Sequence, residues 1–158
     1  MTGKMVEILL VEDNPSDVEL TLHALKKNNL ANRIQVFADG AEALDFMFRR
    51  GRFADRVTRN PRVVLLDLKL PKIDGFDVLR QLKASPDTAA IPVVILTSSR
   101  EERDFARGYA ERANSFIVKP VDWEQFTTAV REIGLYWLLL NQAPSPAAGA
   151  PTEAPKRA

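Results

Sequence analysis

Polar residues directly follow apolar runs at four places in this 158-residue chain. Glu12 and Asp13 follow "ILLV", and Asp67 follows "VVLL". Thr97 and Lys119 follow two further runs, "VVIL" and "FIV". A charged group behind an uninterrupted apolar strand needs a partner, a metal ion or a reaction. These five residues are therefore the first candidates for a functional site.

The residue types point to phosphoryl transfer. Carboxylates brought together repel one another, and a hard divalent ion such as Mg²⁺ relieves that repulsion through oxygen ligands. We expect Asp13 and Asp67 to be direct ligands of this ion. Lys119 offers a positive charge and Thr97 a hydroxyl donor to an anion. Metal, cation and hydroxyl around one carboxylate suit an aspartyl phosphate, with Asp67 as the nucleophile.

The runs that end in these residues predict a parallel sheet. Five short β-branched apolar runs, each followed by a helical pattern, indicate five βα units. Runs without alternation suit strands covered on both faces. We expect an α/β fold with a single doubly wound five-stranded parallel sheet, order 2-1-3-4-5, and helices on both faces. The strand order reverses between strands 1 and 3, and ligands bind at the carboxyl ends of strands at such a point.

The first helix is expected to begin directly behind the acidic pair. Asn14 can cap it, Pro15 suits its first turn, and Asp17 favours the positive end of the helix dipole. The helix is therefore expected to start right after Glu12 and Asp13.

The composition narrows the function classes. Lys and Arg (22) almost balance Asp and Glu (21), so the net charge of +1 does not suggest nucleic acid as a partner. The absence of cysteine excludes disulfides, thiolate metal sites and a cysteine nucleophile. No apolar run approaches the roughly 20 residues of a membrane span. We expect one cytoplasmic domain over residues 1–142 and a disordered Pro/Ala-rich tail over residues 143–158.

Four stretches together carry a family resemblance. "LLVEDN", "LLDLKLPKIDG", "VVILTSS" and "FIVKP" are similar, in this order, to motifs of the receiver domain of bacterial two-component response regulators, a flavodoxin-like fold. The resemblance implies that Asp67 accepts a phosphoryl group from a sensor histidine kinase. It also implies a Mg²⁺ site made by Asp13, Asp67, Glu12 through water, and the backbone carbonyl of Lys69. We further predict that the Lys69 side chain alters the lifetime of the phosphoryl group.

The same resemblance implies a conformational switch. Thr97 and Lys119 would contact the phosphoryl group, and the bond before Pro120 would be cis. Phe116, three residues before the lysine, would move into the space that the Thr97 hydroxyl leaves. Because phenylalanine lacks the hydroxyl of the tyrosine common at this position, an inward Phe116 is favoured even without phosphate. The predicted output surface is helix 4, strand 5 and helix 5.

Two other function classes fit the residues less well. An aspartate-based hydrolase places an acid two residues after the nucleophile, where this chain has Lys69. A flavodoxin-like cofactor carrier needs hydroxyls and amides after the first strand, where "VEDNPSD" has acids that repel phosphate. His23 is expected on the surface of the first helix, not as a phosphotransfer residue. We therefore expect a phosphoacceptor signalling protein and not a turnover enzyme.

The end of the chain predicts a partner surface. The last and longest helix carries an apolar stripe at helical spacing, from Trp123 to Leu140. That stripe does not account for "LYWLLL", which spreads apolar surface around the whole helix. We expect a homodimer through this helix; a helix folded back on its own domain is the alternative. The expected dimer residues are Leu135, Tyr136, Trp137, Leu138 and Leu139.

An arginine-rich stretch, "RRGRFADRVTRNPR", lies between the second helix and the third strand. We interpret its six arginines as a solvated loop, with kinase docking as the sharper alternative. No recognition helix or interleaved aromatic residues accompany it, which disfavours nucleic acid. With "YWLLL", the loop resembles the stand-alone receivers that accompany bacterial phytochromes. This narrower resemblance implies a bacteriophytochrome as the kinase.

Overall fold

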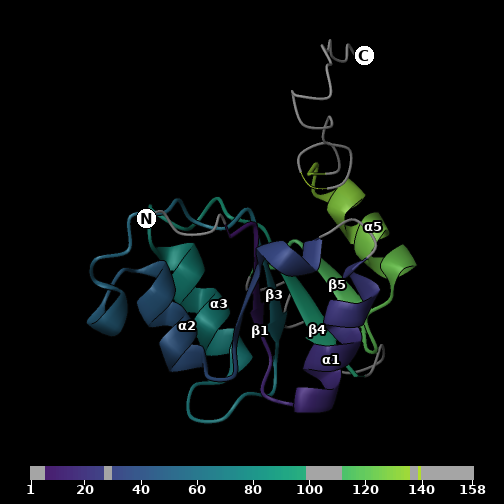
Figure 1. The fold of residues 1–158 in the computed structure, drawn as a ribbon. Coiled ribbons are helices and arrows are strands. Elements are labelled where there is room, and N and C mark those ends of the chain that lie inside the picture. Colours follow the sequence, from purple (N-terminus) through teal and green to yellow (C-terminus); the bar gives the residue numbers. More distant parts are fainter. Residues whose placement is uncertain (1–5, 27–29, 99–111, 136–138, 140–158) are drawn as a thin grey trace.

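The fold is a five-stranded parallel sheet between two layers of helices (Figure 1). The computed structural model describes residues 6–26, 30–98, 112–135 and 139. The strands are β1 (Ile8–Val11), β2 (Ile34–Phe37), β3 (Val63–Asp67), β4 (Val93–Thr97) and β5 (Ser115–Val118). Their order, β2-β1-β3-β4-β5, confirms the predicted sheet, and all four pairings are parallel.

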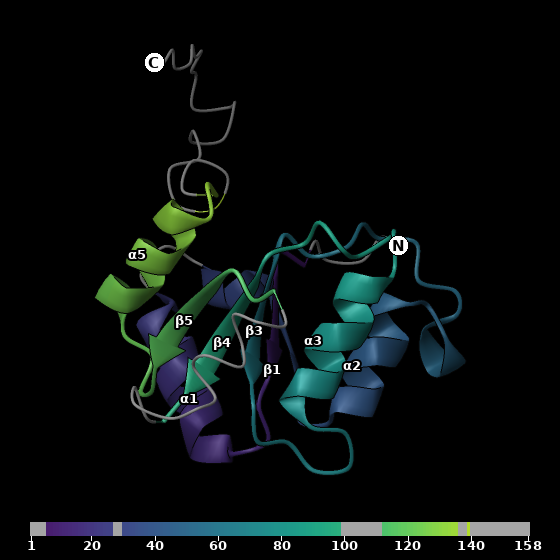
Figure 2. The ribbon, with the colours of Figure 1, turned by 180° about the vertical axis from the view of Figure 1, so that it is seen from behind.

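Four described helices cover the two faces of this sheet. They are α1 (Pro15–Ala24), α2 (Gly40–Met47), α3 (Gly75–Ala84) and α5 (Trp123–Glu132). Two short 3-10 turns, Leu30–Arg33 and Gly51–Phe53, complete the described elements. Helices α2 and α3 lie on one side and α1 and α5 on the other (Figures 1 and 2). The predicted helix 4 falls in segment 99–111, outside the described residues. None of the described helices is long and apolar enough to cross a membrane.

The core consists of two clusters, one on each face of the sheet. Alternate residues of a strand point to opposite faces, so Leu9 and Val11 pack toward α2 and α3, whereas Ile8 and Leu10 pack toward α1 and α5. All four residues of β1 and all five of β3 are buried. Burial of complete strands holds their carboxyl ends at fixed positions, and those ends carry the acidic residues.

Helix α5 is shorter than the sequence predicts. It ends at Glu132, and Gly134 follows with φ of 79° in the left-handed region that favours glycine. The amide of Gly134 donates to Arg131 O and that of Leu135 to Val130 O, which together form a Schellman motif. The expectation of one continuous helix through "LYWLLL" was therefore wrong, because Gly134 stops it.

The chain after Gly134 returns to its own domain. The Leu135 carbonyl accepts the amide of Leu139. Leu139 is buried in the core cluster on the α1 and α5 face, and Leu135 is half-buried against it. Arg33 connects Leu139 to the residue before β1: it forms an ion pair with Glu7 and donates to the Leu139 carbonyl. Residues 136–138 and the predicted tail lie outside the described residues.

The arginine-rich stretch is an exposed loop for most of its length, as predicted, but several of its arginines also make specific contacts. Arg56 donates to the carbonyls of Phe46 and Thr58, and its guanidinium lies 4.2 Å from the ring centre of Phe46. Burial, together with the nearby charge of Arg49, lowers the pKa of Arg56 to about 10. Arg49 itself donates to two backbone carbonyls, and Arg62 pairs with the buried Glu7. Several of these arginines thus hold the loop together, which the sequence pattern did not indicate.

Candidate functional site

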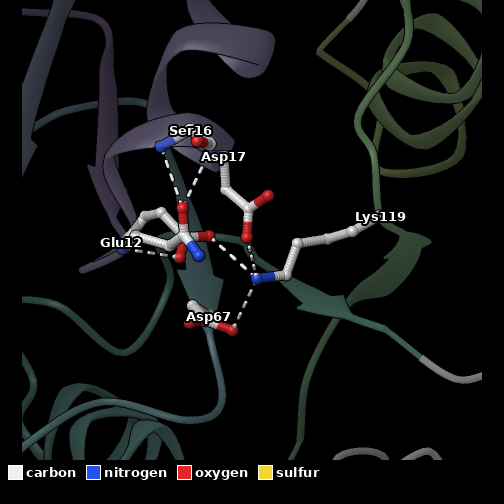
Figure 3. Close-up of polar contacts among 6 residues, drawn as sticks. Glu12, Ser16, Asp17, Asp67 and Lys119 are labelled. Atoms are coloured by element: carbon white, nitrogen blue, oxygen red, sulfur yellow. Dashed lines mark hydrogen bonds and ion pairs between the residues drawn. The ribbon is translucent and has the colours of Figure 1, made fainter.

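The site lies at the carboxyl edge of the sheet, in a cavity of about 400 Å³. Asp67 is the last residue of β3 and Thr97 the last of β4, and Glu12 and Asp13 follow β1 directly. Lys119 follows β5, and Figure 3 shows its ammonium extended toward Asp67 and Glu12. All five residues line the cavity. The structure therefore brings together the residues that the sequence singled out.

Three carboxylates form the centre of the site. One oxygen each of Glu12, Asp13 and Asp67 lies within 4.8 Å of the other two. Glu12 and Asp67 are buried, whereas Asp13 is exposed. The Glu12 amide donates to the Phe37 carbonyl at 2.9 Å, and its side chain accepts the Asn14 amide at 3.2 Å. Hydrogen bonds with backbone groups thus position both the main chain and the carboxylate of Glu12.

Lys119 forms ion pairs with two of these carboxylates, those of Glu12 and Asp67. Its Nζ lies 2.9 Å from Asp17 Oδ2, 3.1 Å from Glu12 Oε1 and 3.3 Å from Asp67 Oδ1 (Figure 3). Burial disfavours its charge, but the hydrogen bond to Asp17 and the charge of Asp67, followed by the contacts with Glu12, raise the pKa of Lys119 above its ordinary value. Lys119 therefore stays charged at neutral pH.

Glu12 shows the opposite balance. Burial and the negative charge of Asp67 raise the pKa of Glu12 to about 7, although the hydrogen bond and charge of Lys119 act to lower it. The cavity is lined by four acids and two lysines: Glu12, Asp13, Asp17, Asp67, Lys69 and Lys119. Because acids outnumber lysines in the lining, the cavity favours the binding of a further cation.

The three central carboxylates fit a hard divalent ion. Oxygens on opposite sides of a Mg²⁺ ion lie about 4.2 Å apart, and neighbouring ones about 3 Å, because each Mg–O distance is about 2.1 Å. The 4.8 Å limit on the oxygens of Glu12, Asp13 and Asp67 is compatible with such an ion when one ligand acts through water. The ligands are all oxygens, as Mg²⁺ and Mn²⁺ prefer.

The remaining predicted residues lie where the sequence placed them. Thr97 is buried and lines the cavity, and its carbonyl accepts the Lys119 amide at 2.7 Å. Lys69 is exposed at the cavity wall, and the Lys119–Pro120 bond is cis. Phe116 in β5 is half-buried and packs against the core on the α2 and α3 face. The switch that we predict for Phe116 remains a prediction.

Two residues at the site escaped the sequence reasoning. Asp17 was expected only to favour the helix dipole, but its carboxylate is the closest partner of Lys119. Its place in the first turn of a helix that starts at the acidic pair indicated that it lies near the site, but not that Lys119 is its partner. The second residue is Gly75, where an added Cβ would lie 2.4 Å from the Asp67 carbonyl oxygen and 2.6 Å from Leu68 Cα. Nothing in the sequence indicated that contact.

Comparison with known proteins identifies the family. The chain matches the response regulator receiver domain over residues 8–131. The chain belongs to the response regulator receiver family. Receivers are phosphoacceptor signalling proteins and not turnover enzymes, and the acidic cluster of this chain is consistent with a phosphoacceptor site.

Several relatives cover almost all of this receiver. The probable methanogenesis regulatory protein FilR2 of Methanothrix harundinacea is 43% identical over 141 residues, which are 89% of this chain and 88% of FilR2. The bacteriophytochrome response regulator AtBRR is 52% identical, with a TM-score of 0.78 over 89% of this chain and 100% of AtBRR. The Mn²⁺-bound form of response regulator Rcp1 is 34% identical, with a TM-score of 0.68 over 89% of this chain and 99% of Rcp1. Rcp1 comes from Synechocystis sp..

Proposed function

We propose that Asp67 is the phosphoacceptor of this receiver. One Asp67 carboxylate oxygen forms a bond to phosphorus while the bond between phosphorus and the donor breaks, and the leaving group keeps the electron pair. The leaving group is a histidine nitrogen of the kinase, or acetate when the donor is acetyl phosphate. The observation that carries the proposal is the charged Lys119 ammonium 3.3 Å from Asp67 Oδ1. It can neutralise charge on the transferred group.

Mg²⁺ is the proposed cofactor. Asp13 and Asp67 would bind it directly, Glu12 through water, and Lys69 through its backbone carbonyl. When bound, the ion supplies charge neutralisation for phosphate oxygens in a cavity that otherwise repels them. The carboxylate geometry and the surplus of acids support this assignment. So does the Mn²⁺-bound form of the similar protein Rcp1.

A bacteriophytochrome-type histidine kinase is the proposed phosphate source, and the cytoplasm the proposed compartment. The support for this partner is the 52% identity to AtBRR over its whole length. Phosphorylation would draw the Thr97 hydroxyl toward Asp67 and further stabilise an inward Phe116, which we expect to be favoured even without phosphate. The half-buried position of Phe116 is compatible with that movement. The altered surface of helix 4, strand 5 and helix 5 would then signal to a partner protein.

Intact-mass spectrometry tests the phosphoacceptor proposal. We expect the wild-type protein to gain one phosphoryl group when incubated with Mg²⁺ and acetyl phosphate. Asp67→Asn should gain none, because an amide cannot attack phosphorus in this way. Asp87→Asn, in the α3–β4 loop, is the matched control and should gain the group as the wild type does. Equal phosphorylation of wild type and Asp67→Asn would contradict the proposal.

We also propose a homodimer through the C-terminal segment 135–139. The support is the concentration of large apolar residues there and the half-buried state of Leu135. Leu139 is buried in its own protomer, so its expected contribution is to anchor the segment. Tyr136, Trp137 and Leu138 would make the contact between protomers.

Analytical ultracentrifugation tests this dimer. We expect a wild-type dimer and a monomeric triple variant in which residues 136–138 are serine, because the variant loses the apolar surface that a dimer would bury. The triple variant should keep its Asp67 phosphorylation, since Leu135 and Leu139, which flank the substituted residues, do not line the cavity. A monomeric wild type at high micromolar concentration, with and without phosphorylation, would overturn the dimer.

A further inference from the structure

Asp17 forms an ion pair with Lys119 that the proposed metal and phosphate roles do not explain. An ammonium group has three N–H donors, and Lys119 Nζ contacts three carboxylates, those of Asp17, Glu12 and Asp67 (Figure 3). Asp17 is the nearest of the three at 2.9 Å. It is absent from the group of acids whose oxygens converge on the candidate metal position. Asp17 therefore acts on the site through its contact with Lys119.

The Asp17 carboxylate projects from a rigid support. Asn14 caps α1 by accepting the Ser16 amide at 2.8 Å and the Asp17 amide at 3.1 Å, and Pro15 fixes the first turn. Asp17 is held there by its backbone, and its side chain is 27% exposed. Glu12, the second anchor, is fixed by backbone contacts of its own. Two carboxylates, one directly after β1 and one in the first turn of α1, thus contact the ammonium in addition to Asp67.

We propose that Asp17 is a positioning residue for Lys119 in the phosphorylation of Asp67. This inference rests on the proposed function and deepens it. Asp17 and Glu12 accept hydrogen bonds from two N–H donors of Lys119, while Asp67 Oδ1 forms an ion pair with the same ammonium at 3.3 Å, so the third donor stays free of these two hydrogen bonds beside the acceptor. As the Asp67 oxygen bonds to phosphorus and the donor's leaving group departs with the electron pair, the third donor passes to an oxygen of the transferred group. The ammonium needs no reorientation during the step.

Asp17 has a second, opposing effect through its charge. A fourth carboxylate in the cavity repels an anionic phosphate donor and weakens donor binding. Asparagine at this position keeps an oxygen that accepts from Lys119 but removes the charge, whereas alanine removes both. The two variants therefore separate positioning from charge.

The experiment measures initial rates of phosphorylation by acetyl phosphate at saturating Mg²⁺, over a range of donor concentrations. We expect the half-saturating donor concentration to fall about twofold in both Asp17→Asn and Asp17→Ala, because both remove the repelling charge. The maximal rate constant should fall about tenfold in Asp17→Ala and less than about threefold in Asp17→Asn. Recovery of the rate by the asparagine oxygen is not expected of a residue that only stabilises the helix.

Glu19→Ala is the matched control. Glu19 is exposed, lies two residues further along α1 and does not line the cavity, so its loss removes an acid from the same helix without touching Lys119. Its maximal rate should equal that of the wild type. Circular dichroism at the assay temperature identifies any variant with lost helix, and Asp17→Asn serves as the measurement if the alanine variant unfolds.

The outcomes distinguish this inference from the proposed function. An unchanged maximal rate in Asp17→Ala would overturn the positioning role while phosphorylation of Asp67 stands. A higher maximal rate in both variants would also overturn it, because Asp17 would then draw Lys119 away from the reaction. If the alanine variant does not fold, a tenfold loss of maximal rate in Asp17→Asn would assign the role of Asp17 to its charge and overturn the positioning role. No mass gain in the wild type would overturn both.

Discussion

Replacement of Lys119 by methionine is expected to slow phosphorylation of Asp67 about 100-fold, because preorganised charge stabilisation of a transferred phosphoryl group is worth that much or more. Methionine preserves much of the side-chain volume and removes the ammonium that faces Glu12, Asp17 and Asp67. The rate constant with acetyl phosphate at saturating Mg²⁺ is the measurement. Mg²⁺ binding should persist, since the variant gains net negative charge in the cavity.

Lys72→Met provides the matched control for Lys119. Lys72 lies in the loop after β3 and forms an exposed ion pair with Asp39 at 3.1 Å, outside the cavity lining. Its removal deletes the same charge from a nearby loop and should leave the rate within about twofold of the wild type. A Lys119→Met rate equal to that of Lys72→Met would contradict the role that we assign to the ammonium.

Gly75→Ala is expected to destabilise the fold by about 3 kcal/mol and to slow phosphorylation of the folded protein. A Cβ at Gly75 would lie 2.4 Å from the Asp67 carbonyl oxygen, and this atom is backbone that cannot rotate away. Part of the strain is relieved only if β3 moves at its end, which displaces the acceptor carboxylate. Urea denaturation gives the stability, and the acetyl phosphate rate well below the unfolding transition gives the effect on the site.

Gly51→Ala separates this local effect from a general cost of losing a glycine. Gly51 has φ of 56°, and its added Cβ would meet only the Asp45 carboxylate at 3.3 Å; neither residue lines the cavity. We expect a loss of about 1 kcal/mol from backbone strain and an unchanged phosphorylation rate. Wild-type stability and rate in Gly75→Ala would show that the close approach does not constrain Asp67.

Much of this fold follows from local sequence signals. Uninterrupted apolar runs predicted buried parallel strands, and the structure has all five in the expected order. Asn14 and Pro15 predicted the start of α1, and both act as expected. The site followed from the same signals, because polar residues behind parallel strands meet at one edge of the sheet. Glu12, Asp13, Asp67, Thr97 and Lys119 all line one cavity.

Most of the features that the sequence did not predict depend on contacts that form only in the folded chain. The partner of Asp17 is 102 positions away, so spacing along the chain carries no trace of the ion pair. Arg56 folds back on Phe46 in three dimensions, and a run of arginines alone looks solvated. Gly134 was a missed local signal, since a glycine within an apolar helical pattern can end the helix. The apolar periodicity outweighed it in the prediction.

The central claim is that the phosphoryl group resides on Asp67. Its most direct test is borohydride reduction of the phosphorylated protein, which converts an aspartyl phosphate to homoserine, followed by peptide sequencing by mass spectrometry. We predict the conversion at Asp67 and at no other acid of the cavity. Conversion at Asp13 or Asp17 in its place, or a phosphorylated protein with no converted aspartate, would contradict the account.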